Sequence, residues 1–140
     1  MANGDDIVDL IAGLALFADL SRPELESAAH TFDEEWFAED QRILRQGFGG
    51  SNFYVILDGE AAVRIDGEQL ATLGRGDFFG EVSVLLGEVP TADVVALRPL
   101  RCLVLSGSEV QEFLTMTPRV MFRMLQAEAR RLRNTLQWRS

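Results

Sequence analysis

The sequence predicts a mainly-β domain in which short antiparallel strands close into a sandwich or barrel and helices flank the strands on both sides. Two observations carry this prediction. Hydrophobic residues recur at every second position within residues 36–105, and at every third or fourth position before and after that segment. Glycine-containing turns separate the short hydrophobic runs in the middle. Short strands at such regular spacing are typical of β-sandwiches and barrels.

Length and composition favour one domain. A chain of 140 residues with 47% hydrophobic residues can bury one core. We expect a single domain over residues 1–140, with a helical lead-in at 5–33, a strand region at 36–105 and C-terminal helices at 108–138. The net charge of -9 disfavours binding to DNA and to anionic membranes. No apolar run approaches the ~20 residues that span a bilayer, so we expect a cytoplasmic location.

Two short helices are predicted before the strands. Residues 9–17 place hydrophobic side chains on one helical face. A second helix is predicted after Ser21, because Pro23 suits a first helical turn and Glu24 completes the spacing of a capping box. His30 lies on this second helix and is interpreted as structural, since a lone histidine cannot build a typical metal site.

The middle of the chain contains five runs that read as strands. Asp66 and Gly67 separate two of them and predict a tight hairpin, because such turns need positive φ angles. Cys102 lies in another run and is interpreted as a buried structural thiol. The five predicted strands span residues 54–57, 62–65, 69–73, 94–97 and 102–105.

The C-terminal part is helical again. Ser106 and Ser108 each begin a sequence with capping-box spacing, and Pro118 begins a long last helix. The hydrophobic stripe on this helix predicts packing against the strands or against the same helix of a second subunit, and we favour a homodimer through the C-terminal helix. The stripe consists of Met121, Met124, Leu125, Ala129, Leu132 and Leu136.

Charge is distributed unevenly along the chain. Residues 1–40 hold eleven acidic side chains against Arg22 alone, whereas residues 119–140 hold six arginines against Glu128. The two ends are therefore expected to attract each other or the ends of a neighbouring molecule. No nucleophile, base and orienting group stand at a recognisable spacing, so the sequence predicts neither an enzyme nor a metal site nor a resident cofactor.

Residues 74–96 carry the strongest functional signal. Gly80 allows a close approach of the backbone, and Glu81 stands in an otherwise apolar run. A carboxylate in such surroundings is expensive to bury, so it faces solvent or pairs with a donor. The run 82–86 is predicted to form a short helical turn whose first amides could hold an oxyanion.

This segment resembles the phosphate-binding cassette of the cyclic nucleotide-binding domain family, with Phe79-Gly80-Glu81 at its start and Pro90 near its end. The similarity extends to Phe17–Ser21, to Asn52–Glu60 and to the approach from Leu73 to Gly80, and so covers most of the chain. It implies a double-stranded antiparallel β-helix, a jelly-roll-like β-roll, with N-terminal helices and a long C-terminal helix.

The resemblance also implies a set of ligand-binding residues. The amides of Gly80, Ser83 and Ala92 would contact a cyclic phosphate, and Glu81 would accept a hydrogen bond from the ribose 2′-hydroxyl. The family has an arginine after the proline, where this chain has Thr91. Losing one partner of a buried charge pair commonly costs ~3–5 kcal/mol. The complete predicted ligand-binding set is Phe79, Gly80, Glu81, Val82, Ser83, Pro90, Thr91 and Ala92.

Charges near this segment bear on its affinity. Glu88 and Asp93 would repel an anion if they faced the pocket, and Arg75, Arg98 or an arginine of the last helix could replace the missing cation. Two hypotheses follow. In the first, the domain senses a cyclic nucleotide or a related small anion weakly and signals through its C-terminal helix. In the alternative, it is a ligand-free dimerisation or protein-interaction module with a degenerate pocket.

Overall fold

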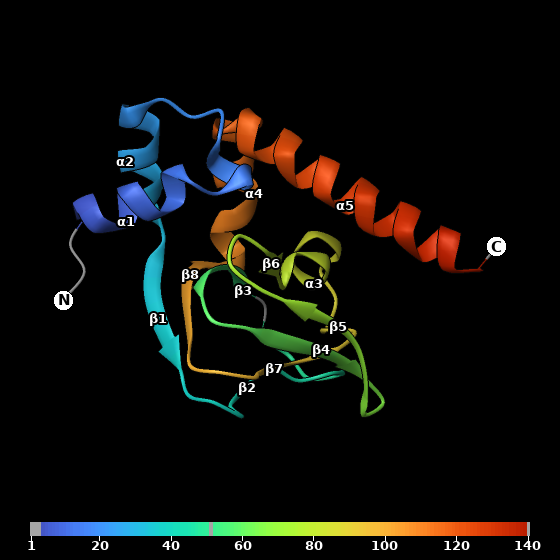
Figure 1. The fold of residues 1–140 in the computed structure, drawn as a ribbon. Coiled ribbons are helices and arrows are strands. Elements are labelled where there is room, and N and C mark those ends of the chain that lie inside the picture. Colours follow the sequence, from blue (N-terminus) through green and yellow to red (C-terminus); the bar gives the residue numbers. More distant parts are fainter. Residues whose placement is uncertain (1–3, 51, 140) are drawn as a thin grey trace.

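The structure is a computed structural model that describes residues 4–50 and 52–139. Helices at both ends enclose a run of strands (Figure 1). The N-terminal part contains α1 (Gly4–Ala12), a 3-10 turn (Ala15–Phe17) and α2 (Arg22–Thr31). The strands are β1 (Asp33–Phe37), β2 (Arg42–Leu44), β3 (Asn52–Asp58), β4 (Ala61–Ile65), β5 (Glu68–Leu73), β6 (Phe78–Phe79), β7 (Asp93–Ala96) and β8 (Leu100–Ser106). Helix α3 (Glu81–Leu86) lies between β6 and β7, and α4 (Gly107–Met116) and α5 (Pro118–Arg139) follow β8.

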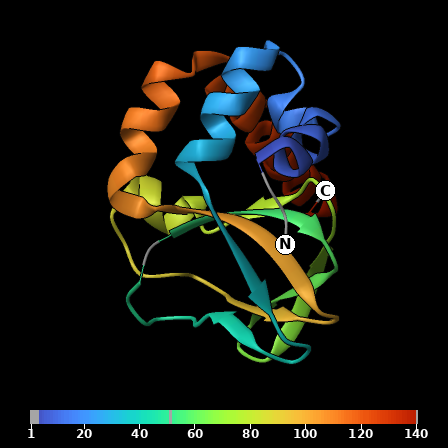
Figure 2. The same ribbon diagram turned by 90° about the vertical axis from the view of Figure 1, so that its left-hand side faces the viewer.

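The strands form two antiparallel four-stranded sheets, in the orders β1-β8-β3-β6 and β2-β7-β4-β5. Figures 1 and 2 show α1, α2, α4 and α5 on one side of the first sheet and the second sheet on its other side. The predicted β-roll with N-terminal helices and a long C-terminal helix is therefore confirmed. The Asp66-Gly67 hairpin is also confirmed, since both residues have positive φ, 52° and 81°.

Two hydrophobic cores lie on the two faces of the first sheet, and β3 contributes to both. Phe53, Val55 and Leu57 pack with the helices, whereas Tyr54 and Ile56 pack with the second sheet. This alternation follows from the period of two in an extended strand. Because both faces of β3 are covered, the strand reads as a continuous hydrophobic run and forms the centre of the fold.

The N-terminal helices match the predictions in one case and differ in the other. The Ser21 side chain accepts a hydrogen bond from the Glu24 amide and the Glu24 side chain accepts one from the Ser21 amide, so the capping box is confirmed. The single helix expected over 9–17 is wrong, because α1 ends at Ala12. Gly13 follows, and Leu14 adopts an extended conformation before the 3-10 turn. Glycine is a poor helix former, which accounts for this break.

The start of α4 also differs from the prediction. Ser106 precedes the helix, but its side chain makes no capping hydrogen bond. The Ser106 and Ser108 hydroxyl groups lie 3.1 Å apart and bond to each other. Strand β8 runs directly into α4, so the position of the strand sets the start of the helix without a capping box.

Helix α5 begins at Pro118, as predicted, but its hydrophobic stripe divides. Met124 is buried in the core with Val120, whereas Leu125 and Leu132 are exposed. The expected attraction between the ends of the chain is present within one molecule. Arg119 pairs with Glu24 at 3.2 Å and Arg123 pairs with Asp19 at 2.7 Å. These pairs fix the first turns of α5 against the N-terminal helices.

Candidate functional site

A cavity of about 630 Å³ lies where the second sheet, α3 and α5 meet. All eight residues of the predicted ligand-binding set line it: Phe79, Gly80, Glu81, Val82, Ser83, Pro90, Thr91 and Ala92. Hydrophobic residues of the second sheet form the opposite wall, among them Leu44, Val63, Leu73 and Val94. Arg131, Asn134 and Thr135 of α5 close one side. The structure thus brings the predicted residues together around one space, and their contacts with a ligand stay a prediction.

Gly80 is required by a close approach between backbones. Its φ angle is 88°, and a Cβ atom at this position would lie 2.2 Å from the carbonyl oxygen of Asn52. The backbone that the glycine approaches therefore belongs to β3. Residues with a side chain rarely adopt this φ, so glycine both permits the turn from β6 into α3 and fixes α3 against β3.

Helix α3 presents one side to the cavity and the other to solvent. Glu81 and Ser83 are buried, whereas Val82 is exposed at the rim. The Ser83 hydroxyl donates a hydrogen bond to the Gly80 carbonyl oxygen at 3.2 Å. On the far side of the cavity, the Gly47 amide donates to the Pro90 carbonyl oxygen at 2.9 Å, which holds the segment before β7 in place.

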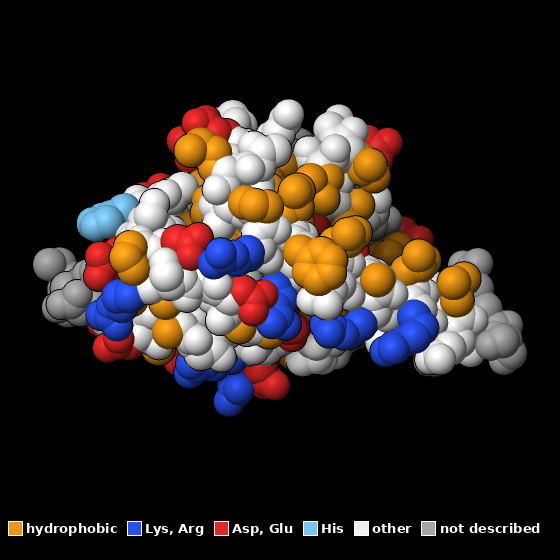
Figure 3. Space-filling model, turned by 90° about the horizontal axis from the view of Figure 1, so that it is seen from above, with side chains coloured by type: hydrophobic (Ala, Val, Ile, Leu, Met, Phe, Trp, Pro, Cys, Tyr) orange, Lys and Arg blue, Asp and Glu red, His pale blue; other side chains and the backbone are white. Residues whose placement is uncertain are grey.

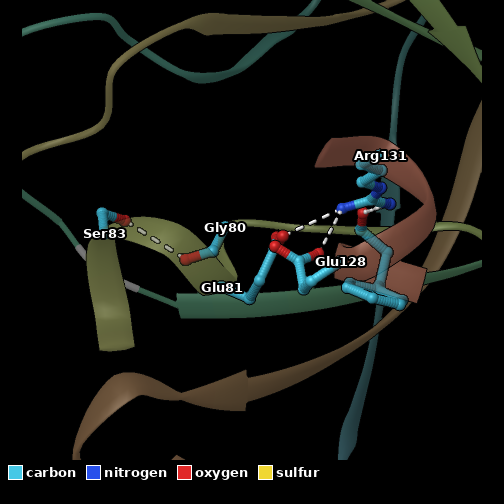
Figure 4. Close-up of polar contacts among 6 residues, drawn as sticks. Gly80, Glu81, Ser83, Glu128 and Arg131 are labelled. Carbon is cyan, nitrogen blue, oxygen red and sulfur yellow. Dashed lines mark hydrogen bonds and ion pairs between the residues drawn. The ribbon is translucent and has the colours of Figure 1, made fainter. Parts of the chain in front are cut away.

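The guanidinium of Arg131 ties α5 to this site (Figure 4). Its Nη1 donates to Glu81 Oε2 at 2.9 Å and to Glu128 Oε1 at 3.0 Å. Its Nη2 donates to the Phe78 carbonyl oxygen at 2.8 Å, and the guanidinium lies 4.4 Å from the centre of the Phe78 ring. One arginine thus contacts two carboxyl groups, a backbone carbonyl and an aromatic ring.

Glu81 is the most perturbed acid of the site. Its side chain is 3% exposed. Burial and the adjacent Glu128 carboxyl raise the pKa of Glu81 to about 8, while Arg131 acts in the opposite direction. Two carboxyl groups beside one guanidinium leave one excess negative charge, and a proton on Glu81 removes it. The expectation that this carboxyl pairs with a donor if it is buried is confirmed.

The other charged residues considered from sequence lie elsewhere. Asp93 does not line the cavity, because its carboxylate accepts a hydrogen bond from the Gln46 amide at 2.7 Å and lies 3.8 Å from Arg42. Glu88 is exposed and is also not part of the lining. The condition under which these two acids would repel a ligand, that they face the pocket, is therefore not met.

Of the cations proposed to replace the missing arginine, the last helix supplies one. Arg131 is the only positively charged residue in the lining formed by the described part of the chain. Arg75 and Arg98 are outside the lining, and Arg98 pairs with Glu60 at 3.1 Å. The sequence could not show which arginine reaches the cavity, since Arg131 lies 50 residues from Glu81. The only signal in the sequence that pointed to Arg131 was the cluster of arginines on an amphipathic helix.

Three further features of the described residues concern metal binding, thiol chemistry and membrane insertion. Within residues 4–50 and 52–139, no group of three or more His, Cys, Asp or Glu side chains is arranged to hold a metal ion. Cys102 is buried as predicted, and burial raises the pKa of its thiol to about 12, which keeps it protonated and unreactive. No helix among the described residues has the length and hydropathy to cross a bilayer.

Comparison with known proteins identifies similar chains. A family model for the cyclic nucleotide-binding domain matches residues 34–116. A cGMP-dependent protein kinase of Caenorhabditis briggsae is 33% identical over 105 residues, which cover 71% of this chain and 14% of that kinase. The chain thus spans only a small part of that relative.

Solved structures agree with the sequence comparison. A cyclic nucleotide-binding domain from Methylobacillus flagellatus superposes with a TM-score of 0.80 at 26% identity, over 96% of this chain and 80% of that one. The catabolite activator protein of Thermus thermophilus gives a TM-score of 0.77 at 28% identity, over 86% of this chain and 59% of that one.

Proposed function

The chain belongs to the cyclic nucleotide-binding domain family, which is regulatory and not catalytic, and on this premise we propose that it binds a cyclic nucleotide or a related small anion weakly and signals through α5. The hydrogen bond from Arg131 to Glu81 carries the proposal, because it connects the last helix to the segment that would hold the ligand. A ligand that reaches Glu81 therefore acts directly on a contact of α5.

Weak binding follows from Thr91. The family's arginine at this place would neutralise the cyclic phosphate, and a threonine hydroxyl supplies no charge. Arg131 is the remaining cation of the described lining, and it is already bound to Glu81 and Glu128. A buried phosphate without a countercharge costs several kcal/mol. We expect a dissociation constant near or above about 1 mM, which corresponds to only about 4 kcal/mol of binding free energy.

Signalling through α5 follows from the contacts that the helix makes at the cavity. Arg131, Asn134 and Thr135 line the space that a ligand would enter. A ligand hydroxyl that donates to Glu81 competes with the Glu128 carboxyl, and a ligand acceptor competes for Arg131. Ligand binding thus weakens the contacts that hold the C-terminal half of α5. A ligand shifts the equilibrium between the attached and the released position of this helix by its difference in affinity for the two positions.

A homodimer through α5 is part of the proposal. Phe122, Leu125, Ala129, Leu132 and Leu136 follow one another at alternating steps of three and four residues, the spacing of a coiled-coil seam. Figure 3 shows hydrophobic side chains in a row along this helix, with arginines beside them. Leu125 and Leu132 are 62% and 61% exposed. A second copy of α5 would cover this row and would place two cavities next to one dimer interface.

One observation favours the alternative of a ligand-free interaction module. Glu81 is already hydrogen-bonded to Arg131 and to the Glu128 carboxyl in the structure, so the chain's own side chains satisfy the group that a ligand would use. In that case α5 would stay attached at all times and the domain would act through its dimer surface alone.

Nuclear magnetic resonance titration separates the two functions. Cyclic GMP and cyclic AMP are added to the 140-residue chain up to about 10 mM, and backbone amide shifts are followed. The proposal expects residues 79–92 and 127–137 to shift together along one binding curve. Saturating shifts at 79–92 without any change in α5 would contradict signalling through the helix. Unchanged spectra would contradict ligand binding and would favour the alternative, a ligand-free interaction module.

A further inference from the structure

The charge balance of the cavity points to a ligand class. Glu81, Glu128 and Arg131 together carry two acidic groups against one basic group. Three of the five guanidinium N–H groups are already bound, two to the carboxyl groups and one to the Phe78 carbonyl oxygen, and one face covers the Phe78 ring. No net positive charge therefore remains in the described lining for an incoming phosphate.

Releasing Arg131 for a phosphate would not solve this problem. If the guanidinium turned to a ligand anion, the Glu128 carboxylate would lose its cation, and the 3% exposed Glu81 and the Phe78 carbonyl oxygen would each lose a hydrogen-bond donor. A buried polar group that loses its partner destabilises the fold. The gain at the phosphate is thus offset by the loss of these contacts.

The same cavity suits an uncharged molecule. Leu44, Val63, Leu73 and Val94 provide apolar walls for a flat ring. The Phe79 ring stacks on Tyr54 with centroids 4.7 Å apart, which makes the wall beside Gly80 rigid. Glu81 offers carboxyl oxygens to hydroxyl donors, and Thr91, Asn134 and Thr135 add neutral polar groups. Binding pockets commonly combine apolar walls with a few such polar groups.

We propose that this cavity prefers an uncharged molecule with a flat ring and neighbouring hydroxyl groups, of the ribonucleoside class, over the corresponding cyclic nucleotide. This inference rests on the proposed function, since it concerns the same pocket, and it narrows the ligand. The phosphate is the part of a cyclic nucleotide that the pocket binds poorly. Removing the phosphate therefore removes the cost of burying its charge and retains the contacts of the ring and the hydroxyl groups.

Isothermal titration calorimetry on the 140-residue chain at pH 7 tests the inference with two matched pairs, guanosine against cyclic GMP and adenosine against cyclic AMP. We expect the nucleoside of at least one pair to bind about tenfold or more tightly than its cyclic nucleotide, which is a difference of about 1.4 kcal/mol. The 2′-deoxynucleoside serves as a further probe and should bind less tightly, since it lacks a hydroxyl donor for Glu81.

Two variants separate charge from shape. Thr91→Arg adds the missing cation at an exposed position of the rim and should reverse the preference in favour of the cyclic nucleotide, whereas the uncharged Thr91→Val should retain the preference of the wild type. Circular dichroism confirms that each variant is folded. A reversal in both variants, or in neither, would contradict the role of charge.

The outcomes distinguish this inference from the proposed function. If the cyclic nucleotide binds as tightly as its nucleoside or more tightly, the inference is wrong and the proposed function stands. If none of the four compounds binds at millimolar concentration while Thr91→Arg binds a cyclic nucleotide, the pocket is intact but ligand sensing by the wild type is wrong as well. Preference for the nucleoside supports the inference, and measurable weaker binding of the cyclic nucleotide in the same series supports the proposed function.

Discussion

Arg131 Nη1 lies 2.9 Å from Glu81 Oε2 and thereby joins the C-terminal helix to the short helix of the cassette. The two partners differ in their surroundings, since the Glu81 side chain is 3% exposed and that of Arg131 is 38% exposed. The acid is thus fixed by the fold, and the base reaches it from a helix at the edge of the cavity. Under the proposed function, α5 would release this pair while residues 79–92 stay in place.

Removing the arginine should destabilise the fold. We expect Arg131→Met to lower the free energy of unfolding at pH 7 by about 1–3 kcal/mol, because Glu128 loses its cation and the buried Glu81 and the Phe78 carbonyl oxygen each lose a hydrogen-bond donor. The loss stays below that of a fully buried ion pair, since Arg131 and Glu128 are partly exposed and Glu81 already holds a proton at this pH. The measurement is urea unfolding followed by circular dichroism.

Arg130 provides the matched control for this variant. It is exposed on the same helix, and no ion pair is found for it in the described structure. Arg130→Met removes the same charge and should change the stability by less than about 0.5 kcal/mol. Equal effects of the two variants would show that the overall charge of α5, and not the contact with Glu81, decides the stability.

The raised pKa of Glu81 predicts a specific dependence of stability on pH. The folded state holds a proton on Glu81 up to about pH 8, whereas the unfolded chain releases it near the ordinary value of 4.5. Between these values the folded state binds more protons than the unfolded state, so this group's contribution to stability is fully present below about pH 4.5 and is lost as the pH rises to about 8.

Glu81→Gln removes this titration and should flatten the corresponding part of the profile. The difference in unfolding free energy between the variant and the wild type should move in favour of the variant by a few kcal/mol, on the order of 1.4 kcal/mol per pKa unit, between pH 5 and pH 8. Glu128 and Arg131, the charged groups that face Glu81, are retained in both proteins. Parallel profiles would mean that Glu81 is ionised throughout this range.

The cassette could be predicted from sequence and the position of Arg131 could not, for a physical reason. Residues 79–92 are close in sequence, and the glycine, the buried acid and the proline each impose a local conformation that a pattern can reveal. Arg131 reaches the cassette only because pairs such as Arg123 with Asp19 set the direction of α5. Such a placement depends on contacts across 104 residues, which local patterns do not encode.

The division of the α5 stripe shows the same limit. Periodicity places Met124 and Leu125 on one side of the helix, but only packing decides that Met124 is 3% exposed and Leu125 is 62% exposed. The sequence does contain a signal for the end of the helix after Ala12, because Gly13 interrupts the expected helix. The hydrophobic residues on both sides of it still pack into one core, which is why periodicity alone extended the helix across the glycine.

Two glycines of the cassette should differ in their tolerance of alanine. Both Gly80 and Gly87 have positive φ, but a Cβ atom on Gly80 would lie 2.2 Å from Asn52 O, whereas a Cβ atom on Gly87 meets nothing within 4 Å. Gly87→Ala should cost about 1–2 kcal/mol for the backbone conformation alone. Gly80→Ala should cost at least about 3 kcal/mol, because β3 or α3 must also move. Thermal and urea unfolding measure both, and equal costs would contradict the close approach at β3.

The exposed row on α5 predicts the assembly state. Sedimentation equilibrium of the wild type at tens of micromolar should give twice the mass of one chain, because Leu125 and Leu132 would otherwise leave a continuous apolar row in water.

Leu125→Asp combined with Leu132→Asp places four carboxylates in the seam of the dimer and should give the mass of one chain. Arg130→Asp changes the charge at a position outside the seam and should leave the dimer intact. Circular dichroism of each variant keeps loss of the dimer distinct from loss of the fold. A monomeric wild type, or a folded double variant that remains a dimer, would show that this row of side chains does not join two copies of the chain.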